Sequence, residues 1–226
     1  MKEQIIGSVP GNVLGMFADL AHKLQHGSIT PEELERFLKK QNPFIGVSEL
    51  MHEWKQFYCD VFGLEKDFSG IRIPEKQKGF DRLLIIAKGM TPMKLYNKIA
   101  ELMPARKYFD DLDKIVSDRK ADHDYAIWIR DRVEADEELK NKSAADLKQE
   151  DIPGVTIEER FIYELKFFKE TGNSEHLDVK NITLCSGSRL PYAHVPFVHW
   201  RDVGVSVDWD YPVHQHAHLR SRAVIF

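Results

Sequence analysis

The chain has 226 residues, of which 42% are hydrophobic and 11% aromatic, enough for one sizeable core or a core with a smaller helper domain. Its formal net charge is −4, which argues against wrapping nucleic acid or docking on an anionic membrane. Only two cysteines are present, Cys59 and Cys185, and they lie far apart. This spacing argues against a disulfide framework and is acceptable in a reducing compartment.

The amino terminus, MKEQIIGSVPGN, has one Lys followed by an acid and no long apolar run. We expect neither a signal peptide nor a membrane span there, which leaves a cytoplasmic or a virion-associated location open.

The first quarter of the chain is expected to be helical. Residues 13–26 carry apolar side chains at helical spacing, and residues 48–62 continue that pattern. Between them, Thr30-Pro31 starts a helix with a capping hydroxyl, a Pro at the first helical position and Glu33 three residues after the cap.

A strand followed by a helix is predicted next. Residues 80–87 form a short apolar run, and Thr91-Pro92 opens an amphipathic stretch that Pro104 closes. Residues 107–124 are highly charged, and we place a boundary near 116–123. The prediction is therefore a mostly helical region, 1–115, and a second domain, 116–226.

The second half begins with a buried strand at 125–129 and an acidic stretch, 133–142, that we interpret as a solvated connector. A helix then starts at Thr156, whose hydroxyl and Glu159 form a capping box, with one apolar stripe. Short strands are expected at Ile182–Cys185, Val203–Trp209 and Arg222–Phe226.

Composition changes abruptly near the carboxyl end. From Asn181 to Phe226 there is no Lys, Glu or Met, yet five of the ten histidines lie between His194 and His218. Lys and Glu are the residues most easily left in water, so their absence suggests that a requirement other than solubility selected this segment.

A metal site is one interpretation of these histidines. His214, His216 and His218 alternate, so on a strand their imidazoles would share a face, and His194 and His199 would approach from a preceding loop. Asp208 and Asp210 would then accept hydrogen bonds from the ring N–H groups of the ligating histidines. The competing interpretation is a polar surface segment that happens to use His.

Nucleophilic catalysis has less support. Cys185, Ser186 and Ser188 lie near several histidines, but no recognised nucleophile motif surrounds them. Cys185 is expected to pack in the core and Gly187 to shape a turn. Trp200 and Trp209 are expected to anchor the carboxy-terminal core, and the alternative for either is a platform on which a ligand stacks.

A genetic origin would also explain the composition. If Asn codons ending in a pyrimidine were randomised at their adenines, His, Tyr and Asp would be common products, whereas Lys, Glu, Gln, Met and Trp would be unreachable. From Ser186 to Phe226, only Trp200, Trp209 and Gln215 fall outside the reachable set. A β-rich segment is also naturally poor in Lys and Glu, so both explanations stay open.

The order of these features resembles the variable proteins of diversity-generating retroelements. It comprises the helix ERFIYELKFFKETG, the strand ITLCSGSR, a variable-looking segment, a Trp-containing strand and the terminal LRSRAVI. The resemblance covers roughly the second half of the chain. It implies an α+β, C-type-lectin-like fold of the formylglycine-generating-enzyme type with helical N-terminal elaboration. Catalytic residues of that enzyme are not implied, because its chemistry depends on a cysteine pair.

The resemblance also implies a variable segment at about 188–218 whose side chains contact a ligand. The implied contact residues are Leu190, Tyr192, His194, Phe197, His199, Asp208, Asp210, Tyr211, His214, His216 and His218. The implied scaffold residues are Leu184, Cys185, Gly187, Trp200, Val205, Val207, Trp209, Leu219, Arg220 and Arg222.

We therefore expect a binding protein without catalytic activity, cofactor or metal, whose partner is a macromolecule and most simply a protein, with no role for nucleic acid or membrane insertion. The alternative is a metal-binding protein or metal-dependent enzyme that uses the carboxy-terminal histidines. A third possibility is an assembly protein whose N-terminal helices mediate oligomerisation.

Overall fold

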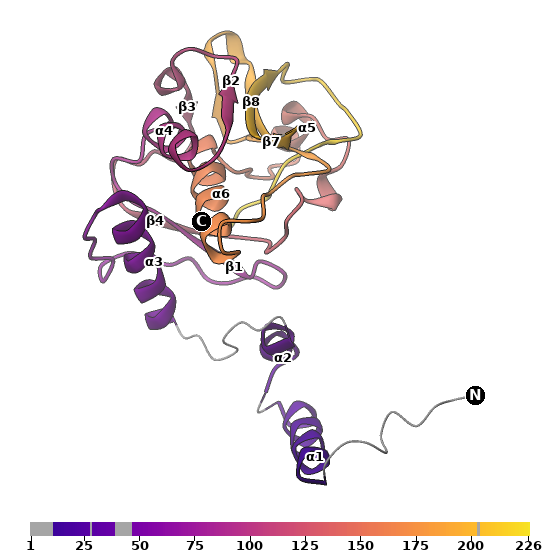
Figure 1. Cartoon of the computed structure of the whole chain (residues 1–226). Coiled ribbons are helices and arrows are strands. Elements are labelled where there is room, and N and C mark those ends of the chain that lie inside the picture. Colours follow the sequence, from indigo (N-terminus) through magenta and orange to yellow (C-terminus); the bar gives the residue numbers. More distant parts are fainter. Residues whose placement is uncertain (1–10, 28, 39–46, 203) are drawn as a thin grey trace. The chain divides into compact units, whose positions relative to one another are not determined.

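The computed structural model describes residues 11–27, 29–38, 47–202 and 204–226 (Figure 1). The chain divides into two compact units, residues 1–50 and 51–226. None of the described helices is long and apolar enough to cross a lipid bilayer.

The first unit contains α1 (Gly11–Gln25) and α2 (Pro31–Leu38), and α3 (Val47–Phe62) begins there and continues into the second unit. The predicted start of α2 is confirmed. Its capping box is complete, because the Glu33 N–H donates to Thr30 Oγ1 at 3.1 Å and the Thr30 N–H donates to Glu33 Oε2 at 2.7 Å.

The second unit is built around α6 (Ile157–Glu170), which contacts α4 (Pro92–Leu102), β1 (Arg82–Ile86) and β7 (Val195–Arg201) (Figure 1). Strand β1 pairs antiparallel with β4 (Tyr125–Ile129). The predicted capping box of α6 is confirmed. The sequence predicted one apolar stripe along α6. The buried surface of this helix is wider than that stripe, since charged side chains of α6 are also buried.

A five-stranded sheet has the order β2-β8-β7-β5-β9. Strands β7 and β8 (Gly204–Asp210) form an antiparallel hairpin, and β5 (Ile182–Leu184) pairs antiparallel with β7. The outer strands, β2 (Ala105–Lys107) and β9 (Leu219–Arg220), run parallel to their neighbours β8 and β5. The described part of the chain is thus an α+β protein, as expected.

The remaining elements are short. Strands β3 (Val116–Ser117) and β6 (Ser188–Arg189) form a small antiparallel pair, and α5 (Ala144–Gln149) was missed by sequence reasoning. Three 3₁₀ turns complete the described part of the unit, η2 (Leu112–Lys114), η3 (Glu137–Leu139) and η4 (Pro191–Ala193).

Strand β7 corrects the expectation of a loop before β8. Pro196 was the misleading signal, because proline is unusual in a central strand. Here Pro196 contributes its carbonyl oxygen, which accepts a 2.8 Å hydrogen bond from the Cys185 N–H. The predicted strand at 222–226 is also wrong, because the structure places only isolated bridges there, at Ala223 and Ile225.

Two further differences concern the middle of the chain. The stretch 133–142 is not simply solvated, because Asp136 is 0% exposed and Leu139 5% exposed. The β1–β4 and β2–β8 pairings join residues on both sides of the expected boundary at 115/116, and both pairs lie within the unit 51–226.

Candidate functional site

The β7–β8 hairpin has an inner face and an opposite face that is only partly accessible, because Val195 and Ser206 on that opposite face are also buried. Because side chains alternate along a strand, Val198, Val205 and Val207 point to the inner face, where each is at most 2% exposed. The opposite face carries four of the eleven implied contact residues, namely Phe197, His199, Asp208 and Asp210. The ladder pairs Phe197 with Asp208.

His214 extends this face. Its Nδ1 lies 2.7 and 2.9 Å from the two carboxylate oxygens of Asp210. The segment 211–218 is also fixed to α5, because Gln215 Nε2 donates to Asp146 Oδ2 at 2.8 Å and the Ala145 N–H donates to the Pro212 carbonyl at 2.8 Å. These hydrogen bonds therefore fix the position of the segment 211–218 relative to α5.

His214, His216 and His218 lie in turns and irregular backbone rather than on a strand, so the expectation of three imidazoles on one strand face is wrong. The His218 N–H donates to His216 Nδ1 at 3.2 Å, and the two ring centroids are 5.5 Å apart. Within the described ranges, no three His, Cys, Asp or Glu side chains are grouped so that they could hold a metal ion.

An aromatic cluster occupies the end of the hairpin. The His194 ring stacks on Trp209 with centroids 4.0 Å apart and an interplanar angle of 8°, and Tyr211 meets the two rings edge-on. His194 and Trp209 are half-buried, whereas Tyr211 is 58% exposed. Trp200 stacks on His176 at 3.4 Å, and both tryptophans are therefore partly packed, partly accessible anchors.

Burial corrects part of the expected contact set. Leu190 is only 6% exposed and cannot reach a ligand in this conformation. Phe197 is half-buried and packs against a small core cluster that includes Leu184 and Val195. By contrast, Tyr192 is 93% exposed and has a φ of 64°, a left-handed conformation that is uncommon for a residue with a Cβ.

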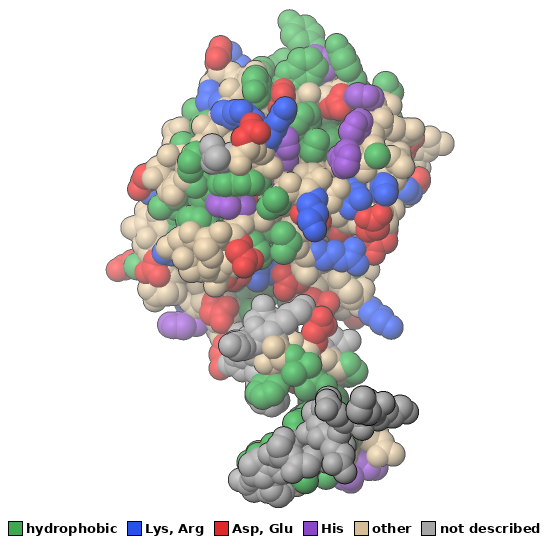
Figure 2. Space-filling model, turned by 45° about the vertical axis from the view of Figure 1, so that its right-hand side comes forward, with side chains coloured by type: hydrophobic (Ala, Val, Ile, Leu, Met, Phe, Trp, Pro, Cys, Tyr) green, Lys and Arg blue, Asp and Glu red, His purple; other side chains and the backbone are tan. Residues whose placement is uncertain are grey.

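Five of the eleven residues are thus exposed, and we refer to them as the loop surface: Tyr192, Tyr211, His214, His216 and His218. Figure 2 shows histidine side chains close together at the surface of the body. Four others, His194, His199, Asp208 and Asp210, are half-buried. Burial, followed by the charges of Arg201 and Arg106, lowers the pKa of His199 and favours its neutral form.

Sequence reasoning missed two neighbours of this face. Arg106 on β2 donates from Nε to Ser206 Oγ at 3.3 Å and pairs with Asp202 at 3.1 Å. Tyr108, just beyond β2, is 58% exposed and its N–H donates to the Val207 carbonyl. They reach β8 only because β2 pairs with it across about a hundred residues of sequence, so no local pattern could have revealed them.

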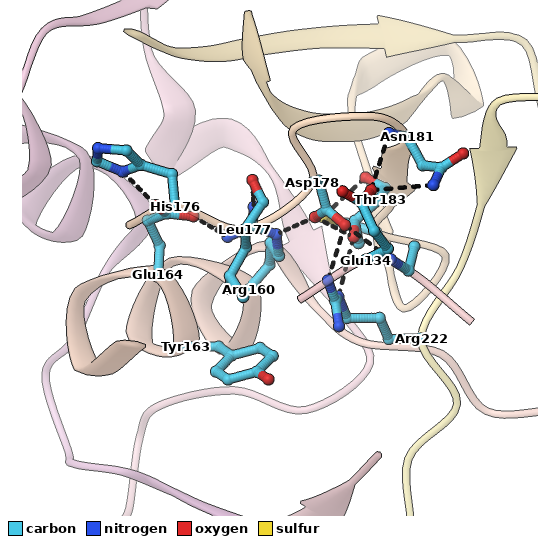
Figure 3. Close-up of polar contacts among 12 residues, drawn as sticks. Glu134, Arg160, Tyr163, Glu164, His176, Leu177, Asp178, Asn181, Thr183 and Arg222 are labelled. Carbon is cyan, nitrogen blue, oxygen red and sulfur yellow. Dashed lines mark hydrogen bonds and ion pairs between the residues drawn. The ribbon is translucent and has the colours of Figure 1, made fainter. Parts of the chain in front are cut away.

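The hairpin lies against a set of polar and charged side chains in the interior that we call the ionic network: Arg160, Glu164, His176, Asp178, Thr183 and Arg222 (Figure 3). Asp178 is its centre. One carboxylate oxygen accepts from Arg160 Nε at 2.9 Å and the other from an Arg222 amino group at 2.7 Å.

The ionic network joins segments that are distant in sequence. It links α6 to the loop before β5 and to the terminal segment after β9. All four side chains of Arg160, Glu164, Asp178 and Arg222 are at most 1% exposed. Buried charges of this kind are tolerated only with such complete pairing, so the network fixes the relative positions of the segments that carry the hairpin.

The candidate nucleophiles are unsuitable for attack on a substrate. Cys185 is fully buried, and burial raises the pKa of its thiol, which keeps it protonated near neutral pH. Ser186 Oγ lies 2.8 Å from Ser221 Oγ in the interior. At Gly187 an added Cβ would lie 2.5 Å from the Gly154 carbonyl oxygen, so this glycine permits close backbone packing.

No protein-family model matches the chain, and no curated protein or solved structure shows significant similarity to it.

Proposed function

We propose that the protein is a non-catalytic binding protein whose loop surface contacts another macromolecule, most simply a protein. The observation that carries the proposal is the separation of roles between the hairpin and the segments that flank it. Val198, Val205 and Val207 on its inner face are buried, while the exposed aromatic and imidazole side chains lie before β7 and after β8, and hydrogen bonds hold the second of these segments in place.

The chemistry of the loop surface suits protein recognition. Tyr and His offer large amphipathic contact areas with few rotatable bonds, so ordering them on binding costs little conformational entropy. Tyr192, Tyr211 and the partly accessible Trp209 are the residue types that dominate binding energy at interfaces.

We further propose that the fold is C-type-lectin-like, of the formylglycine-generating-enzyme type, and that the protein is a variable protein of a diversity-generating retroelement. Two features support this. The antiparallel bridge between Trp128 and Ile225 joins the two ends of the carboxy-terminal region. Between them run α6, β5, the β7–β8 hairpin and β9, in the order that the resemblance implies.

A pair of libraries tests the binding function. One randomises codons 192, 211, 214, 216 and 218 in the full chain, and the other randomises the inner-face codons 198, 205 and 207. We expect most members of the first library to fold, as judged by protease resistance on a display host, and binders to hen lysozyme to be selectable from it. If the first library unfolds as often as the second, the proposed separation of roles is wrong.

The neighbouring DNA tests the genetic origin separately. We expect a reverse-transcriptase gene nearby and a near-copy of the 3′ coding end that differs opposite template adenines. A locus without either feature would contradict the retroelement origin but not the binding function.

A further inference from the structure

A second site, which shares no lining residue with the loop surface, lies in an open cavity of about 450 Å³ beside β3 and the start of α4 and α6. Its volume falls within the range typical of small-molecule sites. Met90 and Ile115, which are 0% and 7% exposed, contribute apolar wall, together with Pro92 and Ala121.

A buried carboxylate forms part of the wall. Glu158, in the first turn of α6, is only 6% exposed and lines the cavity. A chain of hydroxyl groups holds it in place. The Ile157 N–H donates to Ser188 Oγ at 2.9 Å, Ser188 Oγ lies 2.8 Å from Ser117 Oγ, and the Ser117 hydroxyl donates to Glu158 Oε2 at 2.7 Å.

This carboxylate has hydrogen bonds but no counter-ion among the residues that the structure describes. Burial, its largest influence, raises the pKa of Glu158 to about 6, and the hydrogen bond from Ser117 only partly offsets that effect. The neighbouring Glu159 is paired with Arg119, whereas no cation of the described residues forms an ion pair with Glu158. Near neutral pH the protein therefore holds a desolvated negative charge against a cavity.

The other charged groups on the wall are Asp113, Lys120 and Asp122. All three are exposed, Asp113 accepts from the Met93 N–H, and Asp122 pairs with His123. The wall therefore carries three carboxylates and one ammonium group. This charge balance, combined with the apolar lining, favours a ligand that is both cationic and aliphatic.

We propose that this cavity binds a small aliphatic amine in its ammonium form, with the Glu158 carboxylate as its counter-ion. A short alkyl chain would contact Met90, Pro92 and Ile115, and the ammonium group would donate to the carboxylate. This site is independent of the loop surface, so either proposal can fail without the other.

Calorimetric titration of the full chain with n-butylammonium chloride at pH 7.5 tests the proposal. We expect binding that Glu158→Gln weakens at least about 10-fold, since the variant removes one charge-assisted hydrogen bond. n-Butanol, which has a similar shape without the charge, should not bind measurably. The matched control is Asp110→Asn, which removes an exposed carboxylate that does not line the cavity and should change affinity less than about 2-fold.

Two further measurements test whether a loss of binding comes from the site or from misfolding of the variant. Ala121→Leu should weaken binding by narrowing the cavity while Glu158 stays intact. At pH 5, where Glu158 is largely protonated, wild-type affinity should fall. The affinity for butylammonium is also compared with the affinity for Nα-acetyl-lysine methylamide. Tighter binding of butylammonium indicates a free amine as the ligand, and tighter binding of the lysine derivative indicates a lysine side chain of a partner. Absence of butylammonium binding, or equal binding by Glu158→Gln, would overturn the proposal.

Discussion

The ionic network and the loop surface use polar side chains in opposite ways. In the network, Asp178 is 0% exposed and two guanidinium groups depend on its carboxylate. On the loop surface, Tyr192 is 93% exposed, so nearly all of its side chain is accessible to a partner. The comparison teaches that residue type alone does not assign a role here, because burial and partners decide whether a polar side chain is structural or available for binding.

Asp178→Ala is expected to give the largest effect. It leaves the buried charges of Arg160 and Arg222 without their shared carboxylate, which should cost about 3–5 kcal/mol of the free energy of unfolding. Urea denaturation followed by circular dichroism measures this change. Asp178→Asn is the matched variant, because Asn tolerates the φ of 56° at this position and retains the shape but not the charge. A loss below about 1 kcal/mol in both variants would contradict the structural role of the network.

Glu158→Gln should act in the opposite direction at neutral pH. The pKa of Glu158 is raised from 4.5 to about 6 in the folded protein, so the folded state binds this proton more tightly than the unfolded state. The resulting stabilisation is complete below pH 4.5 and is lost as the pH rises through about 6. At pH 7 the variant should be more stable by about 2 kcal/mol.

The pH dependence gives the more specific readout for Glu158. Between pH 4.5 and 6, urea denaturation should show the wild-type protein losing stability relative to Glu158→Gln as the pH rises. Parallel stability curves for the two proteins would show that burial does not perturb this carboxyl group.

His194→Ala tests whether His194 is structural, like the ionic network, or available for binding, like the loop surface. The imidazole is half-buried and stacks on Trp209, so its loss should lower the free energy of unfolding by about 1 kcal/mol. Thermal and urea unfolding measure the change. A loss comparable to that of Asp178→Ala would assign His194 to the structural part of the hairpin.

Single alanine substitutions at Tyr211, His216 and His218 should have the smallest effects, each within about 0.5 kcal/mol, because these side chains are exposed. Tyr192→Gly belongs to the same group, since glycine adopts the φ of 64° without strain. Differential scanning calorimetry of each variant provides the measurement. A substitution that lowers the free energy of unfolding by clearly more than this amount would show that the residue is structural and does not belong to the loop surface.

The sequence by itself determined the locally specified elements. Thr156 and Glu159 predicted the start of α6, and the apolar run 125–129 predicted β4, because capping and strand patterns depend on residues a few positions apart. The buried position of Cys185 was also predictable from its apolar strand.

Only the tertiary structure decided which side chains face solvent and which distant residues join them. Leu190 is buried although it lies in the segment expected to vary, and Pro196 lies within a central strand, where its carbonyl oxygen accepts a hydrogen bond from the Cys185 N–H. Arg106 reaches Ser206 through a parallel pairing of distant segments. Burial and long-range pairing depend on how whole elements pack together, and a local window of sequence does not contain that information.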